Sequence, residues 1–421
     1  MRIFSLLAPL LALAAPLAAQ IESTAAARRV ADDVRLLAAD SLAGRKTCTP
    51  ENEAAARWLA EQLRREGVRP AGDGGTFLQR WTVGNTSATR EAGIAGCETM
   101  NVVGAIPGRG VLAGHLVIVG AHLDHLGRGG FGSRMPADSG RIHNGADDNA
   151  SGTAGVLELA RALRRDRRSR DSRPFRTVLL AFWNGEEAGA LGSRYFAERL
   201  PAPRESVLAY INFDMVGRLR EGRLLALGAR TAEEWPALLD SVNATHRFDL
   251  RASGDGWGPS DHASFYALRL PVLHLFTDLH EDYHRPGDDA AAINADGIAR
   301  VAAFAADLVI RLGRRSAPLT FVDAPPPAPA AGPAGRPRPS LGTIPDMADE
   351  PGGVRLSGVR AGSPADSAGL RAGDVLIGLG EHAIANLQDF QNALMAQQAG
   401  QRVEVRFRRG DQVISVTVTL R

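Results

Sequence analysis

Short apolar runs alternate with longer amphipathic segments as far as residue 312. This alternation limits the classes of fold that the chain can adopt. Patterns typical of buried strands occur at Asn101–Gly108, His115–His125, Thr177–Trp183, Val207–Met215 and Pro271–Phe276. Helical patterns occur at Thr24–Leu63, Thr153–Arg165 and Ile293–Leu312. Strands that are apolar throughout and alternate with helices are typical of a sheet buried on both faces. The sequence therefore predicts an α/β fold with a mostly parallel mixed sheet flanked by helices.

The composition suits this class and argues against a nucleic-acid partner. Of the 421 residues, 44% are hydrophobic and 23% are charged, which is ordinary for a globular protein, and the formal net charge is only +2. The arginine-rich stretch Arg161–Arg176 lacks interleaved aromatic residues and lies where a helix is expected to end. We interpret this stretch as a solvated surface and expect no nucleic-acid partner.

The N-terminal 20 residues have the pattern of a secretory signal peptide. Arg2 precedes an apolar stretch that ends in small residues, so cleavage is expected near Ala19 or Gln20. The mature protein is therefore expected to be exported, to the periplasm or outside the cell, without a membrane span. In that setting Cys48 and Cys97 could form a disulfide, but the sequence leaves their pairing open.

A proline-rich segment divides the chain. Eight of the 22 residues from Ala324 to Pro345 are proline, which is typical of a semi-rigid linker. Short strand patterns follow, interrupted by one helical pattern at about Leu387–Gln397. We expect an α/β domain over residues 21–320, a linker over 321–345 and a small, mainly β domain over 346–421.

Acidic and imidazole side chains gather where the predicted strands end and where the central helix begins. They are His122 and Asp124, Asp148, Glu186 and Glu187, Asp214, and Tyr283 with His284. In open α/β sheets these positions meet at one edge. A single histidine or aspartate there has ordinary explanations, such as a helix N-cap, but so many anions together would repel one another without cations. Two imidazoles and three carboxylates suit two zinc ions, although cobalt or manganese could occupy such a site.

The same segments carry a family resemblance. GAHLDH, GADDNASG, NGEEAGALGS, NFDMVG and YHRPGDD, in this order, resemble the motif series of the M28 family of zinc metallopeptidases. The resemblance implies the phosphorylase/hydrolase-like zinc peptidase fold, with aminopeptidase activity in many members. It also implies that Asp148 bridges two ions, with His122 and Asp214 on one ion and Glu187 and His284 on the other.

The adjacent glutamates would then have different roles. Glu187 would bind metal, while Glu186 would accept a proton from the attacking water and return it to the leaving amine. The two metals would lower the pKa of that water and polarise the scissile carbonyl. Asp124 would orient the imidazole of His122, and Tyr283 would donate a hydrogen bond to the oxyanion.

Other polar residues near these motifs are given ordinary interpretations. His125 and His143 are expected at the rim of the site, and His274 is expected in the core because it alternates within an apolar strand. The contiguous Ser260–His262 does not suit a catalytic triad, since consecutive side chains point in different directions.

The second domain resembles the PDZ domains of exported bacterial proteases. The resemblance lies in GSPADSAGLRAGDVLIGLGEHAI, which begins at Gly362. PDZ domains bind an extended peptide as an added strand and hold its terminal carboxylate in a backbone nest. The corresponding loop here is Leu341–Pro345, and its proline has no amide hydrogen to donate. A peptide or protein partner at this domain and a purely structural role therefore both stay open.

These observations together predict an exported, zinc-dependent aminopeptidase that hydrolyses N-terminal residues of peptide substrates through a water activated by two metals. Three alternatives stay open: a one-zinc glutaminyl cyclase on the same fold, a carboxypeptidase, and an inactive peptide-binding scaffold. All five implied ligands and the implied base are present, which argues against the scaffold.

Overall fold

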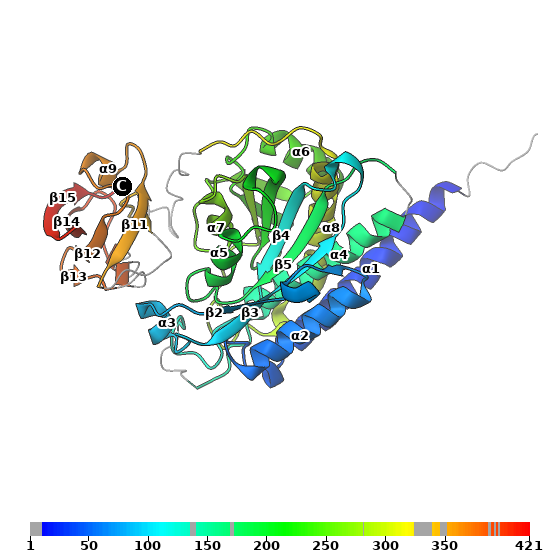
Figure 1. The fold of residues 1–421 in the computed structure, drawn as a ribbon, viewed down its shortest axis with the longest axis horizontal. Coiled ribbons are helices and arrows are strands. Elements are labelled where there is room, and N and C mark those ends of the chain that lie inside the picture. The colour runs from blue at the N-terminus through cyan, green and yellow to red at the C-terminus, as the bar shows by residue number, and fades with distance from the viewer. Residues whose placement is uncertain are drawn as a thin grey trace, which may run out of the picture.

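The structure is a computed structural model with two sheets, each in its own domain (Figure 1). It describes residues 11–134, 140–168, 172–280, 282–323, 339–345, 352–385, 389–390, 393–394 and 396–421. The expected cleavage point lies within the first helix, α1 (Leu11–Leu37), and residues 1–10 lie outside the described part. None of the described helices is long and apolar enough to cross a membrane.

The first sheet has nine strands and carries the predicted apolar runs at its centre. Its strands are β1 (Arg69–Pro70), β2 (Leu78–Thr82), β3 (Glu98–Ile106), β4 (Leu116–His122), β5 (Thr177–Trp183), β6 (Val207–Phe213), β7 (Arg223–Leu227), β8 (Asp249–Ser253) and β9 (Val272–Phe276). Their order is β1-β3-β5-β4-β6-β9-β7-β8, with β2 paired to β3. Strands β5, β4, β6 and β9 are parallel, whereas β3 and β7 pair antiparallel with the outer two of these four. The predicted mixed α/β fold is confirmed.

Helices cover both faces of this sheet (Figure 1). On one face lie α1, α4 (Gly152–Arg168) and α8 (Ala295–Arg314), while α5 (Leu191–Ala197) and α7 (His262–Tyr266) lie on the other. The remaining helices of this domain are α2 (Pro50–Arg65), α3 (Ser87–Glu91) and α6 (Trp235–His246). Alternate residues of β4 face opposite cores: Val117 and Val119 pack in the first, and Leu116 and Ile118 in the second. Burial on both faces explains why the central strands are apolar throughout.

The helical segment predicted over Thr24–Leu63 is in fact two helices. Helix α1 ends at Leu37 and α2 begins at Pro50, where the side chain of Thr49 caps the Asn52 amide. The loop between them, residues 38–49, has positive φ angles at Ala43, Arg45 and Cys48 as well as at glycine. Cys48 forms a disulfide with Cys97, which lies just before β3. The structure thus resolves the pairing that the sequence left open.

The second sheet is antiparallel and has a separate core. Its strands are β10 (Thr343–Pro345), β11 (Val354–Val359), β12 (Val375–Leu379), β13 (His382–Ala383), β14 (Arg402–Arg409) and β15 (Gln412–Thr419), and the short helix α9 spans Pro364–Ser367. Leu356, Leu376, Val405 and Phe407 form the centre of its core. The last residues of the predicted linker pair as β10 with β11. In the segment predicted as a helix around Leu387–Gln397, residues 389–390 and 393–394 are helical, and residues 387–388, 391–392 and 395 lie outside the described residues, as do residues 324–338 of the linker.

Candidate metal centre

The parallel strands of the first sheet bring the predicted ligands to one edge. His122 is the last residue of β4, and Asp214 follows β6 directly. Glu187 lies in the turn after β5, and His284 lies in the loop after β9. Asp148 comes from an irregular helical turn, Ala146–Ser151, that leads into α4.

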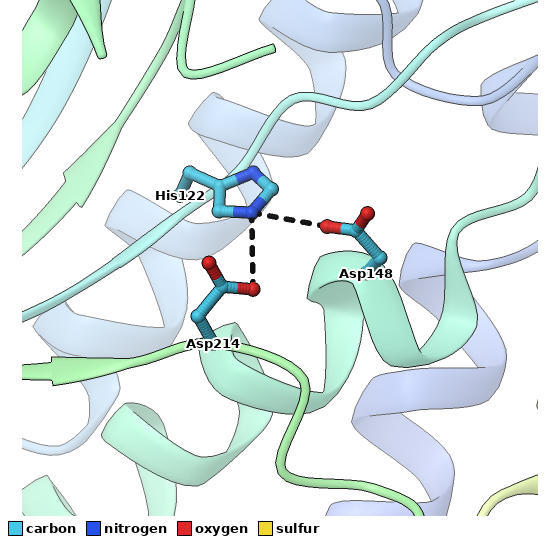
Figure 2. Close-up of side chains that lie close together, drawn as sticks. All are labelled: His122, Asp148 and Asp214. Carbon is cyan, nitrogen blue, oxygen red and sulfur yellow. Dashed lines mark ion pairs between the residues drawn. The ribbon is translucent and has the colours of Figure 1, made fainter. Parts of the chain in front are cut away.

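The carboxylate of Asp148 lies between two imidazoles. Its Oδ1 is 3.1 Å from Nε2 of His122, and that nitrogen is also 3.4 Å from Oδ1 of Asp214 (Figure 2). Its Oδ2 is 3.1 Å from Nε2 of His284, which is also 3.2 Å from Oε2 of Glu187. The two oxygens of one carboxylate therefore face two separate sets of ligand atoms.

The tautomers of these two imidazoles indicate what kind of group the site can bind. Nδ1 of His122 lies 3.0 Å from the backbone carbonyl oxygen of Asp124, and Nδ1 of His284 lies 2.8 Å from that of Gly132. A carbonyl oxygen only accepts, so each Nδ1 donates its hydrogen there, and each neutral ring presents a lone pair at Nε2. Those lone pairs face carboxylate oxygens, which are also acceptors. A divalent cation would satisfy both groups, so the donor set fits zinc.

The charges of the site shift its pKa values in a consistent way. Burial disfavours the charged imidazolium of His122, but the carboxylates of Glu186 and Asp214 overcome this effect and raise its pKa well above the usual range. The pKa of His284 is raised in the same way, against burial, by Glu187 and Asp148. Both shifts show that the carboxylates favour positive charge at these two imidazoles.

The two adjacent glutamates differ as their predicted roles require. Burial raises the pKa of both, but His284 and His125 reverse this for Glu187 and bring its pKa to about 2. The pKa of Glu186 lies well above the usual range because burial, Asp261 and Glu187 outweigh the opposing charge of His122. One glutamate thus stays ionised beside the ligand cluster, while its neighbour can hold a proton.

A cavity of about 290 Å³ opens beside the cluster. Glu186 and Tyr283 line it together with Asp148, Asp214 and His284. The apolar part of its wall includes Met215, Leu227, Trp257, Phe276 and Leu279. Burial raises the pKa of Tyr283 well above 10, an effect that Asp148 and Glu187 reinforce, so its hydroxyl keeps its proton and can donate.

The carboxylate of Asp124 holds the backbone of the glutamate turn. It accepts hydrogen bonds from the hydroxyl of Thr47 at 2.8 Å and from the amide of Glu186 at 3.2 Å. Its Oδ1 lies 3.9 Å from Nδ1 of His122, farther than its own carbonyl oxygen at 3.0 Å. The closer partner of that imidazole is therefore the backbone carbonyl of Asp124.

The rim position predicted for His125 and His143 is wrong, because both side chains are buried. Nδ1 of His125 lies 2.6 Å from Oε1 of Glu187 and 3.8 Å from Oδ2 of Asp148. Ligand atoms of His125, Asp148 and Glu187 all lie within 4.8 Å of one another, so His125 is a further candidate ligand. The sequence signal was present, since His125 lies in the same strand-end motif as His122.

The other two interpretations are confirmed. His274 is buried, with Nδ1 3.1 Å from Nδ1 of His262, although it also lines the cavity beside the cluster. The Ser260 hydroxyl donates to Oδ2 of Asp214 at 2.7 Å and accepts from the side-chain amide of Asn212. Ser260 therefore supports the carboxylate of Asp214, and within the described part of the chain its hydroxyl has no hydrogen bond to a histidine.

Sequence reasoning missed one buried cation next to the cluster. The guanidinium of Arg45 donates to four backbone carbonyls, those of Leu37, Leu123, Asn144 and Gly145. It joins the end of α1 to the turn after His122 and to the turn before Asp148. Burial lowers its pKa to about 10, so it is charged at neutral pH. Nothing in the local sequence marks this role, because all four partners are backbone oxygens and three of them lie far along the chain.

Comparisons with known proteins show which families the two domains resemble. Residues 101–309 match the family model described as Peptidase family M28, and residues 339–420 match the one described as PDZ domain. The chain is 32% identical over 177 residues to leucine aminopeptidase 1 of Arthroderma otae, a match that covers 39% of this chain and 43% of that protein. It is 30% identical over 163 residues to leupeptin-inactivating enzyme 1 of Streptomyces exfoliatus, which covers 38% of this chain and 32% of the relative. These matches span less than half the length of either relative.

The fold has solved counterparts. The structure of BSAP, a zinc aminopeptidase from Bacillus subtilis, matches with a TM-score of 0.52 and 15% sequence identity, over 70% of this chain and 98% of that one. At this identity the likeness shows the fold alone. By its motifs, its fold and the family models that it matches, the chain contains a domain of peptidase family M28, matched over residues 101–309, followed by a PDZ domain.

Proposed function

We propose that this chain is an exported aminopeptidase that holds two zinc ions and removes N-terminal residues from peptides. The observation that carries the proposal is the position of Asp148, whose two oxygens each face the Nε2 lone pair of a different imidazole. His122 and Asp214 would complete the ligands of one ion, and Glu187 and His284 those of the other. When bound, the ions would polarise the scissile carbonyl and lower the pKa of the attacking water.

The chain's own groups would handle the proton and the developing charge. Glu186 lies in the cavity wall and would take a proton from water and deliver it to the leaving amine, as its raised pKa favours. Tyr283 lines the same cavity and would donate to the oxyanion. Asp124 would keep the turn of Glu186 in place through the hydrogen bond from its amide.

Two features favour removal of single N-terminal residues. The cavity beside the ligands has room for about one large side chain and has largely apolar walls. Both curated relatives named above act on peptides or peptide-like compounds by their names, and one is a leucine aminopeptidase. The two ligand sets, one facing each oxygen of Asp148, would hold two ions, and this would distinguish the protein from a glutaminyl cyclase, which uses one zinc.

The test is an activity panel on the mature protein. Aminoacyl p-nitroanilides, an N-blocked peptide with a free C-terminus and a peptide with N-terminal glutamine are each incubated with and without a chelator. We expect release of free N-terminal residues that the chelator abolishes and zinc restores. Cleavage of only the blocked peptide would indicate a carboxypeptidase, and pyroglutamate formation would indicate a cyclase.

Export has a separate test. The protein is produced with its native N-terminus in a bacterial host, and the exported fraction is sequenced from its N-terminus. We expect a mature chain that begins near residue 20. An intact Met1 in the cytoplasmic fraction would contradict export.

A further inference from the structure

The cavity beside the ligand cluster contains a carboxylate and a guanidinium that the proposed reaction does not use. The carboxylate belongs to Asp255, which is 4% exposed and lies in the segment after β8. The guanidinium belongs to Arg360, which follows β11 of the PDZ domain. Both line the same cavity as Glu186 and Asp214, so the PDZ domain supplies part of the wall.

The two charges act on each other through space. Asp255 accepts a hydrogen bond from the Trp257 amide at 3.0 Å. Burial raises the pKa of Asp255, and Arg360 contributes the largest opposing effect, ahead of Arg230. Within the described residues, no ion pair ties Arg360 to a carboxylate, and its buried Nε has no hydrogen-bond partner. The positive charge of Arg360 can therefore compensate the negative charge of Asp255 across the cavity.

The apolar residues around Asp255 and Arg360 connect this charge compensation to substrate specificity. Met215, Leu227 and Phe276 offer apolar walls along which an aliphatic or a long basic side chain could lie. A buried carboxylate whose charge is not compensated favours a cationic substrate side chain. When a nearby cation compensates that charge, the apolar walls determine which side chain binds.

We propose that Asp255 and Arg360 together determine which N-terminal residue the cavity accepts. With Arg360 in place the cavity selects apolar side chains. Without it, Asp255 selects lysine and arginine. This inference rests on the proposed aminopeptidase activity and makes the PDZ domain a contributor to substrate specificity.

The test compares the ratio of kcat/KM for arginyl and leucyl p-nitroanilide in full-length proteins. We expect Arg360→Ala to raise this ratio about tenfold, which corresponds to about 1.4 kcal/mol. Arg360→Lys keeps the charge and should leave the ratio near the wild-type value. Asp255→Asn added to Arg360→Ala should remove the increase. Arg402→Ala, at an exposed arginine on β14, is the matched control and should have no effect.

The outcomes separate the inference from the function on which it rests. A wild-type protein that hydrolyses neither substrate refutes the aminopeptidase activity. An active wild type whose ratio does not change in Arg360→Ala refutes only the role of Arg360. An increase that persists in the double variant, or that appears equally in Arg402→Ala, also overturns the pairing with Asp255.

Discussion

Glu186 and Glu187 are neighbours in sequence, yet the molecule holds them in opposite electrostatic surroundings. Imidazoles on two sides keep Glu187 ionised, whereas Glu186 faces the cavity near other carboxylates. Replacing Glu186 with Gln should therefore lower kcat by about 10²–10⁴-fold with the metal content unchanged. Glu187→Gln, the matched variant, should lose metal. Steady-state kinetics and elemental analysis of both variants test this division of roles. A Glu186→Gln protein that has lost metal but is active would reverse the roles assigned to the two glutamates.

Arg45 is the residue whose loss should affect the ligand turns without touching a ligand. Removing its guanidinium leaves buried carbonyl oxygens of Leu123, Asn144 and Gly145 without this donor. We expect Arg45→Met to lower the free energy of unfolding by about 2–4 kcal/mol and to weaken zinc binding. Arg45→Lys should restore only part of the stability and of the zinc affinity, because an ammonium group lacks the planar set of donors that a guanidinium has. Urea unfolding and zinc titration provide the measurement, and a Met variant with wild-type values would show that the hydrogen bonds are dispensable.

The positions of some residues in and around the ligand cluster could be predicted from the sequence, whereas others could not. The location of His122, Asp148, Glu187 and Asp214 at one edge of the sheet could be predicted, because each ends or follows a strand or precedes a helix in the sequence pattern. Their roles as ligands were implied by the family resemblance. Arg45 could not, since its partners are main-chain atoms about 80 to 100 positions away along the chain for three of its four hydrogen bonds.

At the scale of elements, the loop between α1 and α2 links the N-terminal helices to the active edge of the sheet. Thr47 donates to Asp124 and accepts from the Gly185 amide at 2.9 Å, and the side chain of Asn52 donates to Asn184 at 2.7 Å. The central strands were predicted because burial on two faces leaves an apolar run. The sequence does mark this loop, through Gly44 and through Thr49 followed by Pro50, but the break was missed because an alanine-rich helical pattern lies on both sides of it.

The disulfide should hold this loop in place. Cys48 and Cys97 are 49 positions apart, so replacing both with serine should destabilise the peptidase domain by about 2–4 kcal/mol. Because Thr47 is adjacent to Cys48, kcat should fall as well, even at temperatures where the variant is folded. Thermal unfolding and kinetics with and without reductant test this, and a reduced wild type that keeps both values would show that the bond is not needed.

In the PDZ domain, the element most sensitive to acid is the start of β12. Arg409 donates two hydrogen bonds of 2.7 Å to Asp374, and the Arg371 amide donates another. These bonds lower the pKa of Asp374 against the effect of burial. A carboxyl whose pKa is lower in the folded state stabilises fully above its ordinary value of 3.8 and loses this contribution as the pH falls below it. Unfolding of this domain should therefore become easier below about pH 4, and Asp374→Asn should remove that dependence while lowering stability at pH 7.

At the scale of the whole molecule, two hydrophobic cores are joined by one chain. The peptidase core and the PDZ core share no residues. We expect two thermal transitions, of which only that of the peptidase domain rises with added zinc, since a ligand stabilises the unit that binds it. Differential scanning calorimetry over a zinc titration measures this. A single transition that moves as a whole would show that the domains unfold together.

The central claim is that distant side chains converge to hold a pair of divalent cations on which hydrolysis depends. Its most direct test is the metal content of the purified mature protein and of Asp148→Asn, measured by elemental analysis alongside leucyl p-nitroanilide hydrolysis by the same samples. We expect about two zinc ions per wild-type chain, loss of both metal and activity in the variant, and wild-type activity that disappears on chelation and returns with zinc. A wild-type protein that is metal-free, or that cleaves equally well after its ions have been stripped, would contradict the account.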